Sequence, residues 1–152
     1  MTADPKQGRR VVDPDALRRA RARGDECAAC GGPPSNVHHV IQRGAPHFGD
    51  DVIENLLLLC GTGTSGCHGA WHGSPYVHYY QPWGKGAEPV AERRDKPWVA
   101  VRIGNFIERW SPDTAIYVVE KLGIAPAIVF LWNEYRIKET SVLRIVEEAR
   151  AS

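Results

Sequence analysis

The chain has 152 residues, which is enough for one domain, or for one small domain with an appendage. Its 19 lysines and arginines almost balance its 18 aspartates and glutamates, which excludes a histone-like binder that relies on overall positive charge. Arginines outnumber lysines by 14 to 5, which favours bidentate phosphate contacts. No apolar run could span a bilayer, and the first ten residues lack the apolar core of a signal peptide. We therefore expect a cytoplasmic protein with no membrane partner.

Residues 1–24 form the first of three predicted regions, a loose tail followed by a basic helix. Asp13 is a typical N-cap, Pro14 suits the first turn, and Gly24 favours an end to the helix. This helix has little apolar surface and carries four arginines: Arg18, Arg19, Arg21 and Arg23. They form either a solvated face or a surface that contacts phosphates.

Residues 25–75 form the second region, which holds all four cysteines and five of the six histidines and contains only short predicted elements. The apolar patterns predict strands over 37–41 and 56–59, separated by a loop rich in glycine, proline and aspartate. A glycine-rich loop over 61–66 precedes a short helix over 67–71, which a glycine and a proline end. The predicted order is therefore strand, loop, strand and short helix.

Residues 76–152 form the third region, whose role the sequence leaves open. An irregular wrap precedes residues 98–110, which we predict to be a β-hairpin with a two-residue turn at Gly104-Asn105. A helix is expected from Pro112 to Leu122 and a second from Pro126. Apolar residues with helical spacing predict a third, C-terminal helix. They are Val142, Ile145, Val146 and Ala149.

The four cysteines predict a structural zinc site. Two residues separate Cys27 from Cys30, and this spacing lets both thiolates reach one ion. Six residues separate Cys60 from Cys67, and the three glycines among them would let the loop fold away while the sulfurs converge. The alternative is four unrelated buried cysteines. A closed shell of four thiolates leaves no position for substrate, so such an ion would be structural.

The histidines suggest a second, different site. His38 and His39 are adjacent on a predicted strand, so their side chains should point to opposite sides. His68 and His72 are four apart on a predicted helix, so they should share a face that can hold a metal ion. One of the adjacent pair could join that ion, which would leave the other as a base near Asn55.

These residues together resemble the HNH nuclease motif. The matching segments are His38-His39-Val-Ile, Glu54-Asn55-Leu, Leu59-Cys60 and Cys67-His68-x-x-x-His72. With Cys27-x-x-Cys30 upstream, the chain is similar to the four-cysteine branch of phage and bacterial HNH endonucleases, and to small HNH proteins of actinobacterial phages. The resemblance covers roughly residues 25–75 and implies a ββα-metal fold.

The resemblance also implies a role for each matching residue. His39 corresponds to the general base that activates water, and His38 and His72 correspond to ligands of a catalytic divalent cation (Mg²⁺, Mn²⁺, Ni²⁺ or Zn²⁺). Asn55 corresponds to a residue that either positions the loop bearing the base or enters the metal shell. His68 corresponds to a ligand in the colicin-type nucleases. DNA is the implied partner, and phage packaging proteins are a further one.

We therefore expect an α+β protein in which a small ββα-metal HNH core with a four-cysteine zinc site precedes a β-hairpin and C-terminal helices. Its expected activity is metal-dependent DNA cleavage. Arg43, four residues after His39, would either clamp a phosphate or lie solvated in its loop. The alternatives are a non-catalytic zinc module that binds nucleic acid or protein, and a thiol-redox protein. A thiol-redox protein would need a βαβ unit around its Cys-x-x-Cys motif, and the sequence does not predict one here.

Overall fold

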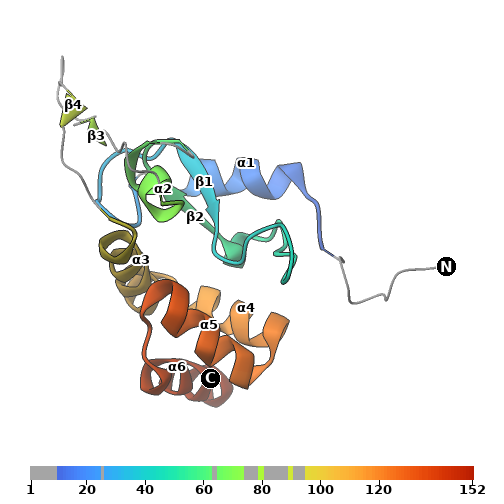
Figure 1. Cartoon of the computed structure of the whole chain (residues 1–152). Helices are drawn as coiled ribbons and strands as arrows, with labels where there is room; N and C mark the ends of the chain where they lie inside the picture. Colours follow the sequence, from blue (N-terminus) through green and yellow to red (C-terminus); the bar gives the residue numbers. More distant parts are fainter. Residues whose placement is uncertain (1–9, 25, 63–64, 74–78, 81–88, 91–94) are drawn as a thin grey trace.

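The structure is a computed structural model of the chain, and it describes residues 10–24, 26–62, 65–73, 79–80, 89–90 and 95–152. The protein is α+β and mostly helical (Figure 1). In chain order its elements are α1 (Pro14–Arg23), β1 (Asn36–His39), the 3-10 helix η1 (Ile53–Asn55), β2 (Leu56–Leu59), α2 (Gly66–Trp71), β3 (Tyr79–Tyr80), β4 (Pro89–Val90), α3 (Lys96–Trp110), α4 (Pro112–Leu122), α5 (Ile124–Tyr135) and α6 (Glu139–Ala151).

Strands β1 and β2 pair antiparallel and are central to the N-terminal half. Val37 is opposite Leu58 and His39 is opposite Leu56, which fixes the register. All four leucines of β2 are buried, as expected for a strand covered on both faces. Leu57 and Leu59 belong to the main core, whereas Leu56 packs under α1. The strands expected over 37–41 and 56–59 are thus present, the first of them shorter than predicted.

Helix α1 forms where the sequence predicts it. The carboxylate of Asp13 accepts a hydrogen bond from the Asp15 amide at 3.0 Å, and Gly24 follows the last turn. Ala16 and Ala20, one turn apart, are buried against Leu56, so small side chains bring the helix close to the sheet. The opposite face of α1 is left to its charged residues.

The predicted β-hairpin over 98–110 is wrong, because these residues lie in the 15-residue helix α3. Asp95 caps the helix by accepting a hydrogen bond from the Trp98 amide at 3.0 Å. The buried positions recur with a helical rather than an alternating period. They are Val99, Ala100, Ile103, Gly104 and Ile107. Gly104 is not a turn residue: a Cβ there would lie 2.0 Å from the Tyr135 carbonyl oxygen of α5.

Helices α4, α5 and α6 confirm the three C-terminal helices, although α5 begins at Ile124 rather than at Pro126. They form the lower part of the molecule in Figure 1, and α3 contacts α2, α4 and α5. One buried cluster includes Leu59 and Trp71 together with Ile103, Leu131 and Ile145. A common core therefore joins the strands to the C-terminal helices.

Most of the expected irregular wrap lies outside the described residues, as does the tail before Arg10. Strands β3 and β4 form a second small antiparallel pair, with Tyr79 opposite Val90. In the described part of the chain, no helix combines the length and apolar character needed to cross a membrane.

We predict that Gly104→Ala destabilises the protein, because the new methyl group would press on the Tyr135 carbonyl where α3 crosses α5. The expected loss is about 1–3 kcal/mol of unfolding free energy, typical of overpacking. Gly44→Ala is the matched control, since a Cβ at Gly44 meets nothing within 4 Å. Urea unfolding of both variants tests this, and equal stabilities would contradict it.

Candidate metal centre and histidine pocket

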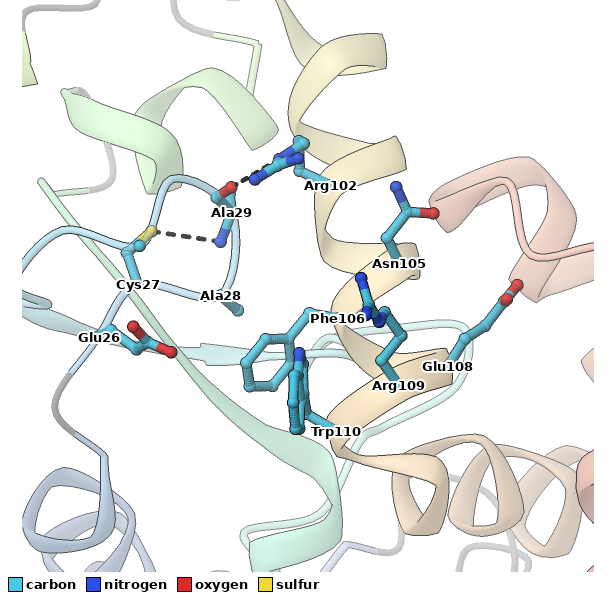
Figure 2. A pocket seen from close by; sticks show the side chains of 11 residues that line it. Glu26, Cys27, Ala28, Ala29, Arg102, Asn105, Phe106, Glu108, Arg109 and Trp110 are labelled. Atoms are coloured by element: carbon cyan, nitrogen blue, oxygen red, sulfur yellow. Dashed lines mark hydrogen bonds between the residues drawn. The ribbon is translucent and has the colours of Figure 1, made fainter.

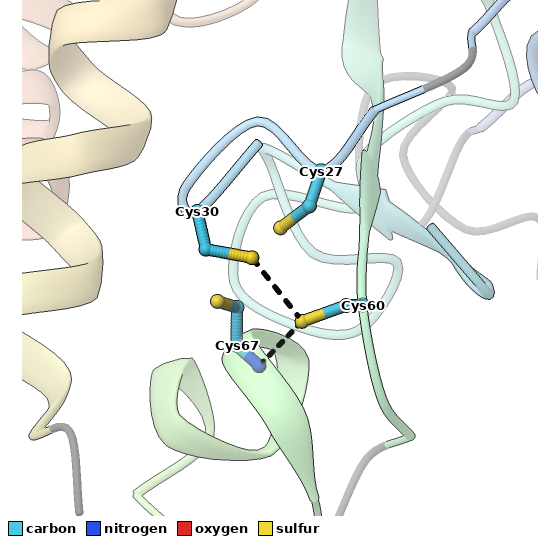
Figure 3. A group of neighbouring side chains, drawn as sticks. All are labelled: Cys27, Cys30, Cys60 and Cys67. Carbon is cyan, nitrogen blue, oxygen red and sulfur yellow. Dashed lines mark hydrogen bonds between the residues drawn. The ribbon is translucent and has the colours of Figure 1, made fainter. Parts of the chain in front are cut away.

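The four cysteines come together from three separate segments (Figure 3). Cys27 and Cys30 lie in the loop after α1, Cys60 follows β2, and Cys67 is in the first turn of α2. All four sulfur atoms lie within 4.8 Å of one another, and those of Cys30 and Cys60 are 3.7 Å apart. Tetrahedral zinc with bonds of about 2.3 Å places its sulfurs about 3.8 Å apart. The group can therefore hold a structural metal ion such as zinc.

The long spacing between Cys60 and Cys67 is absorbed by a tight turn. Gly61 and Gly66 both have positive φ, and a Cβ on either would overlap backbone atoms of the other end of the turn. Thr62 pairs with Ser65 across it. The expectation that the glycines let this loop fold back is confirmed, and residues 63 and 64 at its tip lie outside the described residues.

Backbone amides support the sulfurs. The amides of Ala29, Gly32 and Cys67 each donate to a cysteine sulfur at 3.4 Å. Contacts from Cys27, Cys60 and Cys67 hold the pKa of the Cys30 thiol far below its ordinary value, although burial raises it. These contacts favour the thiolate at Cys30, whereas contacts with Cys27 and Cys30 raise the pKa of the Cys60 and Cys67 thiols. A bound cation would be needed to hold all four as thiolates, the form that binds a metal.

A hollow of about 290 Å³ lies apart from the cysteine cluster. Its lining includes His39, His68 and His72 together with Arg21 and Arg43. It lies where α1, β1 and α2 meet. The Nε2 atoms of His68 and His72 are 3.1 Å apart. Two imidazoles that share one ion, with bonds of about 2.0–2.1 Å, place their nitrogens about 2.9–3.4 Å apart. This pair can therefore serve as two ligands of one metal ion.

The histidines of this region are held in their neutral form. Burial lowers the pKa of His68 to about 4, helped by the charges of His72 and His39. Burial and then Lys96 lower the pKa of His72. Burial also lowers the pKa of His39, and Arg43 and Arg10 add to this, against the opposing effect of Asp51. Neutral imidazoles can bind a metal or accept a proton at neutral pH.

His38 does not line the hollow that its sequence neighbour lines. It is fully buried, with Nε2 2.9 Å from the hydroxyl oxygen of Tyr135 and its ring against Trp71 at a centroid distance of 4.7 Å. Its Nδ1 is a buried atom with no hydrogen-bond partner among the described residues. The two adjacent histidines thus have the different surroundings expected from the strand, and the ligand role of His38 stays a prediction.

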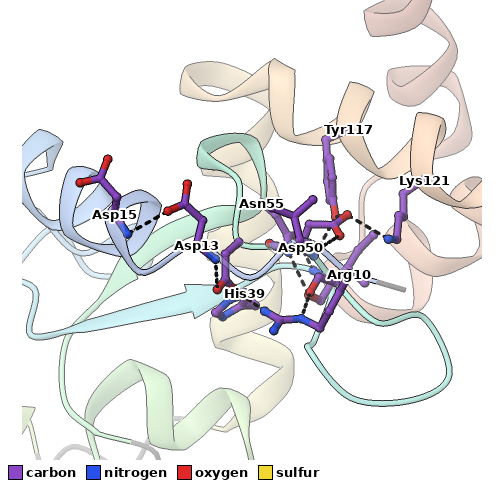
Figure 4. Close-up of polar contacts among 12 residues, drawn as sticks. Arg10, Asp13, Asp15, His39, Asp50, Asn55, Tyr117 and Lys121 are labelled. Atoms are coloured by element: carbon purple, nitrogen blue, oxygen red, sulfur yellow. Dashed lines mark hydrogen bonds and ion pairs between the residues drawn. The ribbon is translucent and has the colours of Figure 1, made fainter. Parts of the chain in front are cut away.

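Two aspartates that the sequence analysis did not single out, Asp50 and Asp51, organise the loop beside His39, and Figure 4 shows the polar contacts of Asp50. Asp51 Oδ1 lies 2.8 Å from His39 Nε2 and also pairs with Arg10. Asp50 accepts hydrogen bonds from the Val11 amide and the Tyr117 hydroxyl and forms an ion pair with Lys121. These contacts join residues 10–13 and α4 to the loop between the strands.

Asn55 is fully buried, and its amide closes the same loop. Its Oδ1 accepts from the Ile41 amide at 2.8 Å, and its Nδ2 donates to the carbonyl oxygens of Ile41 and Asp50 at 3.0 and 2.9 Å. The side chain of Asn55 therefore joins the two ends of the loop, at Ile41 and at Asp50. Of the two roles that the resemblance implies for Asn55, these contacts support the first, positioning of the loop next to His39.

The five candidate arginines have different surroundings. Arg21 and Arg43 line the histidine hollow. Arg18 and Arg19 form exposed ion pairs with Asp15. Arg23 donates to the Leu56 carbonyl at 3.0 Å. Only two of the five are thus brought to the candidate site.

Another hollow, of about 430 Å³, lies between the cysteine loop and α3 (Figure 2). Phe106 and Trp110 lie side by side there, with Arg102 and Arg109 on the same helix, and Arg102 donates to the Ala29 carbonyl. Trp110 is 71% exposed, so this tryptophan is not a core residue. Charges of both signs line this hollow, because Glu26 and Glu108 also face it.

Comparisons of the chain with protein families, with curated proteins and with solved structures find no match. The interpretation of these residues therefore depends on their chemistry and geometry. Two features carry it: the four converging thiols, and the pocket in which three histidines and two arginines meet.

We predict one tightly bound zinc ion per chain, held by the four cysteines. Cys30→Ser should abolish stoichiometric binding and unfold the N-terminal half, because metal-binding energy is folding energy in such small sites. Metal analysis after dialysis, with circular dichroism on the same samples, tests this. Less than half an equivalent of zinc in folded wild-type protein would contradict it.

We also predict that stability falls as the pH drops from 6.5 to about 4. His68 has a folded pKa of about 4 against an ordinary value of 6.5, so in this window the unfolded chain binds more protons than the folded one. His68→Gln should flatten the dependence of unfolding free energy on pH in this window. Because wild type and variant share the cysteine cluster, their difference isolates the histidine. Parallel pH profiles would contradict the prediction.

Proposed function

We propose that the chain is a metal-dependent DNA endonuclease of the HNH type, with its active site in the histidine pocket. The observation that carries this proposal is the meeting of three neutral histidines and two arginines in one hollow beside the paired strands and α2. The order of strand, loop, strand and short helix supports a ββα-metal arrangement. The cysteine cluster supports the four-cysteine branch of that family.

His39 is the proposed general base. It is largely buried, lines the pocket and has a lowered pKa, so its neutral ring is available to take a proton from water. That water attacks phosphorus, and the bond to the 3′ oxygen breaks. The contacts of Asn55 with Ile41 and Asp50 support its role in holding the loop that follows His39.

The imidazoles of His68 and His72 are the proposed ligands of the catalytic divalent cation. Their Nε2 separation of 3.1 Å fits two ligands of one ion, and both rings line the same hollow as His39. When bound, such an ion stabilises negative charge on the phosphate and on the departing oxygen. His38 remains a predicted ligand, with its buried Nδ1 available and its ring 5.6 Å from that of His68.

Arg21 and Arg43 are the proposed phosphate contacts. They reach the pocket from α1 and from the loop after β1, so each would offer a guanidinium group to a phosphate of a bound strand. DNA is thus the proposed substrate. Docking to phage packaging proteins stays a prediction from the resemblance alone.

The test is cleavage of supercoiled plasmid by purified protein across Mg²⁺, Mn²⁺, Ni²⁺ and Zn²⁺. His39→Ala should lose on the order of 10²- to 10⁴-fold in rate at every metal concentration, as expected for a missing general base. His72→Ala should lose activity that excess metal partly restores, because it weakens the ion site rather than the base.

His47→Ala is the matched control, because His47 contacts Phe130 outside the pocket. This variant should cleave plasmid like wild type. Calorimetry distinguishes the two variants: His39→Ala should bind the divalent ion like wild type, whereas His72→Ala should bind it more weakly. Cleavage that survives His39→Ala and His72→Ala would indicate a contaminant. A wild-type protein that binds zinc and DNA without cleaving it would favour the non-catalytic zinc module.

A further inference from the structure

Asp51 occupies an unusual position beside the proposed base. Its side chain is 4% exposed, and one oxygen, Oδ1, faces both His39 Nε2 and the guanidinium of Arg10. Its second oxygen accepts a hydrogen bond from the Asp13 amide at 3.0 Å. Both carboxylate oxygens are therefore occupied, and the group is held from three directions.

This arrangement fixes which nitrogen of His39 carries its proton. A carboxylate that already accepts from Arg10 and from the Asp13 amide acts as an acceptor, so the His39 Nε2 at 2.8 Å must donate. In the neutral ring, the lone pair is then on Nδ1. Nδ1 is the ring nitrogen that Asp51 does not engage, on a side chain that lines the pocket.

Contacts to the backbone around His39 fix the position from which its side chain extends. Gln42 donates to the carbonyl oxygen of His39, and Asn55 ties the next residues of the chain to the start of β2. Residues 10–13 reach Asp50 and Asp51 from outside the strands. The N-terminal arm therefore contributes to the placement of a side chain nearly thirty residues later.

We propose that Asp51 is a positioning residue that holds His39 as the Nε2–H tautomer, so that Nδ1 is the atom that accepts the proton from water. This inference rests on the proposed function for its catalytic meaning, but the tautomer itself is a property of the resting protein. Asp51 touches neither DNA nor the metal ligands in this scheme, and acts through His39. A carboxylate in this relation to a catalytic imidazole favours one tautomer and orients the ring.

The experiment combines ¹⁵N spectroscopy of the histidine rings with plasmid cleavage, using the full chain loaded with zinc. The His39 signals are assigned by their loss in His39→Gln. Wild type should show a protonated Nε2 and an unprotonated Nδ1. Asp51→Ala should relax the ring toward the tautomer mixture of free histidine, in which Nε2–H only predominates, and should cleave on the order of 10²-fold more slowly or worse. Asp51→Asn keeps the side-chain shape but can turn an N–H toward the ring, so it should favour the opposite tautomer and should not restore cleavage.

Asp50→Asn is the matched control for damage to the loop. Asp50 is the neighbouring buried aspartate, with bonds to Val11, Tyr117 and Lys121 and none to His39. Asp50→Asn should lower the unfolding free energy of the protein and leave the His39 tautomer unchanged. A wild-type His39 protonated on Nδ1, or an Asp51→Ala ring with the same tautomer ratio as wild type, would overturn the inference whatever the cleavage rate. A wild type that shows the tautomer but cuts no plasmid with any metal would overturn the proposed function instead.

Discussion

Four thiols from three segments must converge before α2 can take its place beside the strands. Cys60 follows β2 directly and Cys67 lies in the first turn of α2, so the turn between them sets the angle at which the helix leaves the sheet. His68 follows Cys67 directly, and His72 lies one turn later. The positions of both histidines thus depend on the cysteine cluster, even though the cluster takes no part in their chemistry. A structural ion there would stabilise a small fold and align its candidate site at the same time.

The second constraint comes from the C-terminal helices. Tyr135 of α5 is fully buried, donates to the Val40 carbonyl at 2.7 Å and lies against His38 and Trp71. Gly104 lets α3 approach the Tyr135 carbonyl closely enough for this side chain to reach β1. The helices therefore support the strand that carries both adjacent histidines. Through Asp50, Tyr117 and Lys121, helix α4 supports the following loop in the same way.

The parts of this fold that local chemistry determines could be predicted from the sequence. The capping of α1 by Asp13 and Gly24, the fold-back of the cysteine loop and the different surroundings of His38 and His39 all depend on nearby residues. The hairpin prediction for residues 98–110 is wrong because β-branched residues and a Gly-Asn pair favour a hairpin locally, whereas long-range packing decides for a helix. The decisive contact of Gly104 is with Tyr135, 31 positions away. The contacts of Asp51 with His39 and of Tyr135 with His38 could likewise not be predicted, because no local sequence pattern indicates them.

The charges around the pocket bear on how its proposed ligands would act together. Among the described residues, those that line it include histidines and arginines but no acidic side chain. Lys96 acts on His72 and Arg43 acts on His39, and each lowers the pKa of its neighbour. Two neutral imidazoles surrounded by positively charged side chains should bind a divalent ion weakly. The ligands carry no negative charge to attract the ion, and the nearby cations repel it. In the proposed enzyme, a DNA phosphate would supply the missing negative charge beside the arginines. In the proposed enzyme, metal and DNA should therefore strengthen each other's binding, with reciprocal effects on the two affinities.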